Sequence, residues 1–332
     1  MFPLLLQVTA RTIMAGMNLN TRAADLCAQG IQQADRLRIT ASESDAGSKL
    51  IDCGVKAPGG LEAGRWLARI CTAGLSDVEF LQDVPEVFSG PAVSVATDHP
   101  TMACMAAQYA GWQLSAGDFV AMGSGPMRAA AGREELFQQI GYSEQAPEVV
   151  GVLECGQLPP SELCVDIAAA CRVPPENLTL LVARTSSIAG TVQIVARSIE
   201  TAIHKLHELG FDLSRIQSGW GISPLPPMAA NDLAGIGRTN DSVLYGGRVT
   251  LWVTGDDASI ASLGPLVPSC ASQDFGLPFA QIFQRYDHDF YRIDPHLFSP
   301  AQITFHNLDS GNSHRFGEPK PDVLQRSFGM DG

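Results

Sequence analysis

Apolar residues in the stretch 187–208 recur at steps of three and four positions, the spacing that one buried face of an α-helix requires. The members of this stripe are Ile188, Val192, Val195, Ile199, Ile203 and Leu206. At about 3.6 residues per turn, roughly the opposite face carries Gln193, Arg197, Glu200 and His204. The pattern therefore predicts one long helix that presents an amide, a guanidinium, a carboxylate and an imidazole in a single polar stripe.

Elsewhere, short runs rich in apolar and β-branched residues alternate with helical patterns, and glycine and proline separate them. The predicted strands are 50–55, 92–96, 119–122, 149–153, 178–182 and 249–254. The predicted helices are a first one from Asn20 or Thr21 to about Arg38, then 61–72, 100–110, 128–138, 160–171, 187–208 and 276–286. This alternation indicates an α/β (α+β) fold. Because several strands are separated by more than one helix, a simple doubly wound sheet of the Rossmann type is not expected.

Composition and charge narrow the classes of partner. The 332 residues are 45% hydrophobic and 17% charged, enough for one large or two medium domains. The net charge of −13 argues against nucleic acid and against an anionic membrane surface, which both attract basic surfaces. It does not exclude a phosphorylated small ligand, because a few local donors can bind one. No apolar run reaches the length of a transmembrane helix.

The cysteines and the first residues bear on location. Eight cysteines are scattered without a Cys-x-x-Cys pair, which suits free thiols in a reducing cytosol. Residues 1–16 contain a short apolar run but no basic start and no clear cleavage site. We expect them to be a disordered extension, or to follow from an upstream start codon, rather than a signal peptide. The expected location is the cytoplasm.

Several local patterns have both a structural and a functional interpretation. The polar stripe is either a solvated face with an Arg197–Glu200 ion pair or part of a site. The turn 123–126, with Ser124 and Gly125, either starts a helix or offers backbone amides to an anion. Asp98 either caps the helix that follows or faces a ligand. Arg238 either sits in a turn between a helix and a strand or pairs with an anionic ligand.

Metal and redox chemistry have little support in the sequence. His204 and His207 lie on one helix, but no third ligand is evident. No convincing dinucleotide-binding loop is present either. We therefore expect no zinc and no redox cofactor.

Six segments, in order along the chain, resemble the methenyltetrahydromethanopterin cyclohydrolase family. They are Thr97-Asp98-His99-Pro100, 121–126, the helix segment 182–205, 237–241 followed by 244–248, 290–295 and 300–304. The matches to the family as a whole run from about Leu19 to about Arg315, nearly the entire chain. No single segment is decisive, but their joint order is highly specific.

The resemblance implies a fold of two α/β-type domains with mixed sheets flanked by helices and a substrate cleft between them. From composition, the best local boundaries give an N-terminal domain 17–146 and a C-terminal domain 147–325 that carries the helix of Arg197 and Glu200. The true boundaries could be discontinuous. The resemblance also implies a homotrimer and no cofactor, with tetrahydromethanopterin as the substrate carrier.

The family's substrate holds a methenyl carbon between two pterin nitrogens as an amidinium-like cation. Water adds to that carbon and one C–N bond opens to leave a 5-formyl group, so a metal is not needed to polarise it. The resemblance assigns the activation of water to Glu200 and its orientation to Arg197. Substrate-binding residues are expected among Gln193, Ser124, Gly125, Asp98 and Arg238. Two alternatives remain open: a non-catalytic pterin-binding protein, and a metal-dependent amidohydrolase of another substrate.

Overall fold

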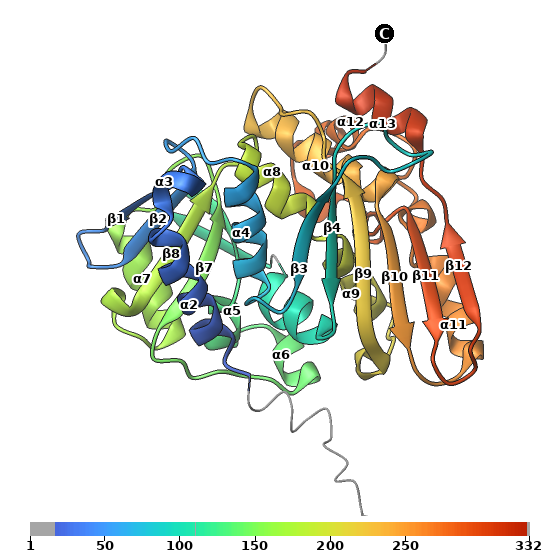
Figure 1. The fold of residues 1–332 in the computed structure, drawn as a ribbon, viewed down its shortest axis with the longest axis horizontal. Helices are drawn as coiled ribbons and strands as arrows, with labels where there is room; N and C mark the ends of the chain where they lie inside the picture. Colours follow the sequence, from blue (N-terminus) through green and yellow to red (C-terminus); the bar gives the residue numbers. More distant parts are fainter. Residues whose placement is uncertain (1–16, 110, 331–332) are drawn as a thin grey trace, which may run out of the picture.

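The computed structural model describes residues 17–109 and 111–330, which form two six-stranded sheets flanked by helices (Figure 1). The first sheet has the strand order β1-β2-β8-β7-β6-β5, and the second sheet has the order β12-β11-β10-β9-β4-β3. In the first sheet β8 pairs in parallel with β2 and β7, whereas in the second sheet only β10 and β11 are parallel. The mixed pairing confirms the predicted fold class and differs from a doubly wound sheet.

The elements have the following bounds. The strands of the first sheet are β1 (Thr40–Glu43), β2 (Lys49–Gly54), β5 (Trp112–Ala116), β6 (Phe119–Ser124), β7 (Val149–Glu154) and β8 (Leu178–Ala183). The strands of the second sheet are β3 (Asp77–Leu81), β4 (Ala92–Thr97), β9 (Ile216–Pro224), β10 (Arg248–Val253), β11 (Gln302–Asn307) and β12 (Ser313–Gly317). The α-helices are α2 (Leu19–Ile31), α3 (Ala34–Leu37), α4 (Leu61–Cys71), α5 (Met127–Ala131), α6 (Glu135–Ile140), α7 (Ser161–Cys171), α8 (Ile188–Val195), α9 (Ser198–Glu208), α10 (Asp232–Gly246), α11 (Asp257–Leu263), α12 (Phe279–Arg285) and α13 (Pro321–Phe328). The remaining helical segments are the π-helix η1 (Thr101–Gln108) and the 3-10 turns η2 (Pro175–Asn177), η3 (Leu213–Arg215), η4 (Gly264–Leu266), η5 (Ser269–Ala271), η6 (Phe290–Arg292) and η7 (Pro295–Leu297).

All six predicted strands are confirmed, as β2, β4, β6, β7, β8 and β10. The first helix differs from its prediction, because it begins at Leu19 and stops at Ile31. Asn20 therefore lies inside the helix and does not cap it. Its buried side chain instead donates to the Pro126 carbonyl and to Glu144, at 2.9 and 3.1 Å, and ties α2 to the loops that follow β6.

The chain does not divide between the two sheets at the predicted boundary of 146 and 147. That boundary falls between β6 and β7, which are hydrogen-bonded neighbours in the first sheet. Each sheet combines strands from before and after this point, because β3 and β4 join the second sheet while β7 and β8 complete the first. Membership of the two sheets is therefore set by long-range pairing and not by chain order, and the domain boundaries stay a prediction.

The first sheet is covered on both faces. Along β8, Leu180 and Val182 pack with α7 on one face, while Leu181 and Ala183 pack with α2 and α4 on the other. Successive side chains of a strand point to opposite faces, so a strand buried on both sides reads as a continuous apolar run. This explains why β8 was recognisable from sequence.

Helices α4 and α8 lie between the two sheets (Figure 1). They approach closely because Gly64 faces α8: a Cβ at Gly64 would lie 2.6 Å from Cβ of Val192. A second close approach brings α9 onto the second sheet. There a Cβ at Gly221 of β9 would lie 3.0 Å from Cγ1 of Ile199. These two glycines let the helices that carry the polar stripe pack against both halves of the molecule.

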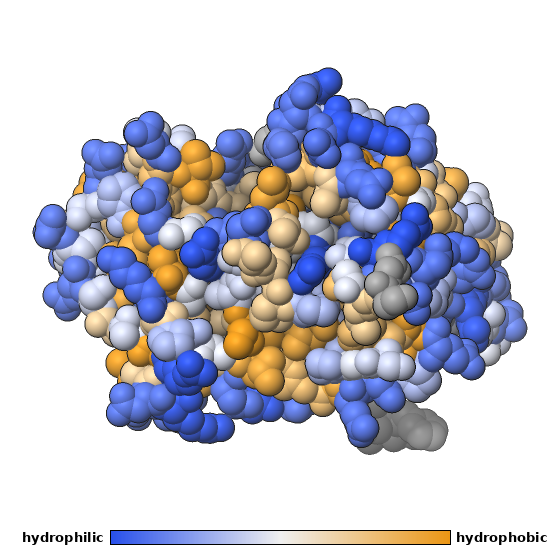
Figure 2. Space-filling view, turned by 90° about the horizontal axis from the view of Figure 1, so that it is seen from above, coloured by the Kyte–Doolittle hydropathy of each residue, from blue (hydrophilic) through white to orange (hydrophobic). Residues whose placement is uncertain are grey.

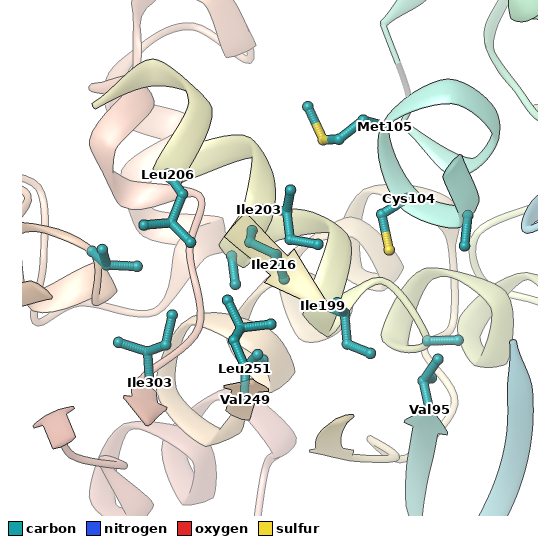
Figure 3. Packing of buried hydrophobic residues seen from close by; sticks show 14 of the residues in the cluster. Val95, Cys104, Met105, Ile199, Ile203, Leu206, Ile216, Val249, Leu251 and Ile303 are labelled. Carbon is teal, nitrogen blue, oxygen red and sulfur yellow. The ribbon is translucent and has the colours of Figure 1, made fainter. Parts of the chain in front are cut away.

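The apolar stripe of residues 192–206 is buried in the core of the second sheet. Figure 3 shows Ile199, Ile203 and Leu206 of α9 directed toward Leu251 and Ile303 of the sheet, in one cluster. The predicted buried face is confirmed from Val192 to Leu206, where each apolar member of the stripe is at most 1% exposed, whereas Ile188 is only partly buried.

The surface is mixed in hydropathy. On the face in Figure 2, hydrophilic residues dominate both ends and hydrophobic ones gather toward the middle. None of the described helices has both the length and the apolar character to cross a membrane.

Candidate active site

The predicted single helix 187–208 is in fact two helices, because Ala196 and Arg197 form a turn between α8 and α9. Ser187 caps α8 by accepting a hydrogen bond from the Gly190 amide at 3.0 Å. At the break, the Gln108 side chain donates to the Ala196 carbonyl at 3.3 Å. A tertiary partner thus satisfies a carbonyl at the turn, which is one of the recognised causes of a helix kink. The break places Arg197 at the N-cap position of α9 and Glu200 in its first turn.

Arg197 is the centre of a buried hydrogen-bond network. Its side chain is 6% exposed. Nη1 donates to the Gln108 carbonyl at 2.5 Å. Nη2 lies 2.9 Å from Ser124 Oγ, 3.2 Å from Gln193 Oε1 and 3.3 Å from Glu154 Oε1. The acceptors come from η1, β6, α8 and β7, so the guanidinium joins elements of the first sheet to the start of α9.

Glu154 is the ion-pair partner of Arg197. It is the last residue of β7, and its Oε1 also accepts from Gln193 Nε2 at 2.8 Å. Among the described residues it is the only carboxylate within 4.0 Å of the guanidinium. The Arg197–Glu200 pair considered from the sequence is therefore not formed. Glu154 was not among the predicted site residues, although a carboxylate directly after a buried parallel strand is a usable signal, since ligand sites gather at such strand ends.

Glu200 is buried beside this network and has an unusual protonation equilibrium. Glu200 is only 5% exposed. Burial raises the pKa of Glu200 from 4.5 to about 7, Arg197 and Arg128 lower it, and Glu154 adds to the rise. A carboxyl whose pKa lies near neutral pH can both take and release a proton under working conditions.

An aromatic and cationic cluster adjoins Glu200. The Tyr109 ring stacks on the His204 imidazole, with centroids 4.7 Å apart and planes at 20°. The guanidinium of Arg128 lies 4.5 Å from the centroid of the same tyrosine ring and pairs with Glu134 at 2.8 Å. Burial lowers the pKa of His204, which favours the neutral imidazole. The His204 side chain is 24% exposed, so the stack reaches from the buried charges to the surface.

Two buried donors near Glu200, Arg197 Nε and Arg128 Nη2, have no protein partner within the described ranges. Buried polar atoms of this kind are usually satisfied by an ordered water or a ligand. Both arginines lie close enough to Glu200 to lower its pKa by their charge. The arrangement suits the binding of a small polar molecule beside this carboxyl.

Known proteins are similar in sequence to this chain along most of its length. A family model described as cyclohydrolase (MCH) matches residues 18–328. The methenyltetrahydromethanopterin cyclohydrolase of Rhodopirellula baltica is 47% identical over 290 residues, which cover 86% of this chain and 87% of that protein. The protein of the same name from Xanthobacter autotrophicus is 46% identical over 316 residues, which cover 94% of this chain and 93% of that protein. The one from Methanococcoides burtonii is 39% identical over 318 residues, which cover 95% of this chain and 99% of that protein. This chain belongs to the MCH cyclohydrolase family.

Within this MCH family chain, the structure brings together some of the predicted site residues. Arg197 contacts Gln193 and Ser124 directly, and Glu200 lies in the same buried region. Gly125 follows Ser124 with φ of +87° and lies against β7, where its Cβ would be 3.4 Å from the Val152 amide. Its observed role is the tight turn from β6 to α5.

Arg238 does not occupy the predicted turn between a helix and a strand. It lies in the middle of α10, and its Nη1 donates to the carbonyls of Pro227 and Met228 at 3.0 Å each. The prediction failed because Asn and Asp at 240 and 241 suggested a turn. In the structure Asn240 donates to the Ile236 carbonyl at 2.9 Å and Asp241 accepts from the Phe279 amide at 2.8 Å, both compatible with a helix.

Asp98 lies at a separate cavity of about 750 Å³. His99, Trp220 and Trp252 share its lining, whereas the four residues of the polar stripe do not. Asp98 accepts from Ser218 Oγ at 2.7 Å, and η1 begins at Thr101 without a side-chain cap. The predicted capping role of Asp98 is therefore wrong. Gln193, Arg197 and Glu200 are instead buried, at most 5% exposed, and do not line this cavity.

Two further features bear on the type of chemistry. Within the described residues, no group of three or more His, Cys, Asp or Glu side chains is arranged to hold a metal ion. Cys71 lies 3.8 Å from Gln193 Oε1, and burial raises its pKa to about 11. Burial also raises the pKa of Cys104, which lies near Glu200. These thiols are protonated at neutral pH and are unsuited to act as nucleophiles.

Proposed function

We propose that this chain hydrolyses 5,10-methenyltetrahydromethanopterin to 5-formyltetrahydromethanopterin, reversibly, as a step of one-carbon metabolism. Membership of the MCH family supports the proposal, and the relatives compared above carry this enzyme's name. The observation that carries it in the structure is a buried carboxyl of near-neutral pKa, Glu200, whose charge is influenced by a nearby arginine, Arg197, that surrounding acceptors hold in place.

The reaction needs little besides placement of a water and movement of protons. The methenyl carbon is electrophilic because it shares the positive charge of the amidinium-like cation. A water oxygen bonds to this carbon, and one proton of the water is removed. The bond from the carbon to one of its two nitrogens then breaks, that nitrogen is protonated, and the hydroxyl group on the carbon loses its remaining proton as the formyl C=O forms. The products are the formamide and, in net terms, one proton released to solvent.

In this proposal Glu200 accepts the proton of the attacking water and its negative charge stabilises the cationic substrate. It is then the nearest proton donor for the leaving nitrogen. Arg197 orients the water. Its Nη atoms are engaged by protein acceptors, whereas Nε is a buried donor without a partner in the described part of the chain. The guanidinium is thus held in place while one N–H stays available.

The remaining substrate contacts are assigned more coarsely. Gln193 and Ser124 contact Arg197, so each holds the arginine and is proposed to face the pterin as well. Gly125, Asp98 and Arg238 stay proposals for substrate binding. We further propose that the enzyme needs no cofactor, acts in the cytoplasm and assembles as a homotrimer. Metal analysis and light scattering of the purified protein test the first and last of these.

Turnover of the methenyl substrate tests the central proposal. Purified protein should remove the methenyl absorbance in a water-dependent reaction. The Glu200→Gln variant should turn over about 10²- to 10⁴-fold more slowly, a far larger effect than that on substrate binding, since the amide is nearly isosteric and cannot take a proton. Binding without turnover in the unmodified protein would instead favour a non-catalytic pterin-binding protein. Loss of activity on chelation, restored by metal, would favour a metal-dependent amidohydrolase.

A further inference from the structure

We propose that Glu154 is a positioning residue of the active site: its carboxylate fixes Arg197 and Gln193 in one orientation and limits how strongly the positive charge of Arg197 acts on Glu200. This inference rests on the proposed function for its kinetic consequences. Its geometric basis is independent of the reaction.

The geometry gives Glu154 two simultaneous contacts through one oxygen. Oε1 accepts from Gln193 Nε2 at 2.8 Å and from Arg197 Nη2 at 3.3 Å. The same Arg197 nitrogen also lies 3.2 Å from Gln193 Oε1. The three side chains therefore close a ring of hydrogen bonds. Within such a ring the amide of Gln193 has only one orientation that satisfies both neighbours, because its nitrogen must face Glu154 and its oxygen must face Arg197.

The three side chains of this hydrogen-bond ring come from different secondary-structure elements. Glu154 ends β7, where it pairs with Ala183 of β8 and Met122 of β6. Gln193 belongs to α8, and Arg197 stands at the break before α9. A shift of α9 relative to the first sheet would stretch these contacts. Glu154 thus links the first sheet to the helix start that carries Glu200.

The negative charge of Glu154 has a second effect, which is on the ionisation of Glu200. The charged or titratable groups that act on Glu200 come from the α8–α9 break (Arg197), α5 (Arg128) and β7 (Glu154), and Glu200 in turn acts on Cys104 of η1 and on Tyr109. Both arginines favour the ionised carboxyl, whereas Glu154 opposes ionisation. Arg197 also forms its ion pair with Glu154, which offsets part of the charge that Glu200 would otherwise experience.

Two variants of Glu154 separate these effects. Glu154→Gln keeps the length of the side chain and an acceptor for Gln193 and Arg197 but removes the charge. Glu154→Asp keeps the charge but is one methylene shorter, so it cannot reach both donors at the observed distances. Glu176→Gln is the matched control, because it also removes the charge of one glutamate. Glu176 is exposed and lies just before Leu178, the first residue of β8, whereas Glu154 pairs with Ala183 at the other end of that strand.

The first measurement is the pH profile of kcat/KM for the methenyl substrate. In Glu154→Gln the acid limb should move to lower pH by about 0.5 unit or more, because Glu200 then ionises more readily. In Glu154→Asp the limb should stay where the wild-type protein has it, while kcat falls about tenfold or more with little change in KM. Glu176→Gln should match the wild-type profile. A purely structural Glu154 would lower the melting temperature without moving the limb.

The second measurement does not need turnover. Infrared titration of the Glu200 carboxyl in the substrate-free protein, assigned with Glu200→Gln, should show the same downward shift in Glu154→Gln. An unchanged Glu200 titration together with an unchanged acid limb would overturn the proposal. If Glu154→Gln does not fold, wild-type kcat in Glu154→Asp would overturn it. Absence of turnover in the wild-type protein would sink the proposed function alone, since the infrared titration would still decide the role of Glu154.

Discussion

At the scale of single residues, the protonation of Glu200 couples stability to pH. Its pKa is raised from 4.5 to about 7 in the folded protein. The folded state therefore holds a proton more tightly than the unfolded state, and the resulting stabilisation is full below about pH 4.5 and lost as pH rises through about 7. At about 1.4 kcal/mol per pKa unit, the loss reaches roughly 3 kcal/mol.

Glu200→Gln removes this ionisation, so the stability of the variant relative to wild type should rise between pH 5 and pH 8. The check is chemical unfolding of both proteins across this range. The buried guanidinium of Arg197 loses a nearby negative charge in the variant, which reduces the gain at high pH. A constant difference from pH 5 to pH 8 would show that Glu200 does not titrate in this window.

The geometry of Arg197 leads to a second prediction at this scale. Its planar guanidinium places different nitrogens on the Gln108 carbonyl and on the acceptors around Ser124. Lysine keeps the charge but has a single nitrogen and cannot serve both directions. Arg197→Lys should therefore lower kcat about 10- to 100-fold. Steady-state kinetics decide, with Arg36→Lys, at an arginine that is 65% exposed and lies outside the proposed site, as a control that should show near-normal kcat. Equal losses in both variants would show that the buried network has no special part in catalysis.

The residues of the candidate site could be predicted from the sequence more easily than their contacts. The apolar stripe identified the buried face correctly, and Arg197, Glu200, Gln193 and Ser124 were all among the predicted site residues. The ion-pair partner was missed because Glu154 is 43 positions away from Arg197 in the chain. Asp98 and Arg238 have local side-chain chemistry that suits a ligand. Their actual hydrogen bonds, to Ser218 and to the carbonyls of Pro227 and Met228, depend on the tertiary fold.

At the scale of elements, the break between α8 and α9 could not be predicted from the sequence. Neither Gly nor Pro occurs at residues 194–199, and the apolar spacing continues through the turn. The break depends on Gln108, which comes from the end of the π-helix η1 and contacts both residues of the turn. Segments of π-helix are rare and occur often at functional sites. Here η1 supplies Gln108 to the turn and leads into Tyr109.

Close packing of α4 on α8 is a second property at this scale, and it can be tested. A Cβ at Gly64 would lie 2.6 Å from Val192 Cβ and 3.1 Å from Ala189 Cα, so Gly64→Ala should push α8 away from α4. We expect a loss of about 1–3 kcal/mol in unfolding free energy and a fall in kcat, because α8 carries Gln193. Urea unfolding and kinetics measure the two effects.

Gly156→Ala is the control for Gly64→Ala, since its Cβ would meet only Asp232 Oδ2, at 3.4 Å. It should be close to neutral in stability. If Gly64→Ala were as stable as Gly156→Ala, α4 and α8 would have to accommodate the added methyl group without loss of packing, which would contradict the prediction.

At the scale of the whole molecule, the sequence predicted strands but not their membership of sheets. Each of the six predicted strands had a strong local apolar signal. Their arrangement depends on pairs that are distant in the chain, such as β2 with β8 and β4 with β9. The same long-range pairing brings β7 beside the helix break, which is why Glu154 and Arg197 meet at all.

This topology predicts that the two halves of the chain do not fold separately. A fragment of residues 17–146 would contain β1, β2, β5 and β6 of the first sheet but would lack β7 and β8, the two central strands that join them. From the second sheet it would hold only β3 and β4 at one edge. Strands without their neighbours leave backbone donors and apolar faces unpaired, so the fragment should show no cooperative thermal unfolding and poor dispersion in its amide NMR spectrum. The complementary fragment 147–332 should behave likewise in the region of β7 and β8, while mixing the two fragments should restore part of the native signal. A cooperatively unfolding fragment 17–146 would contradict this prediction and favour the contiguous domain boundary that composition suggests.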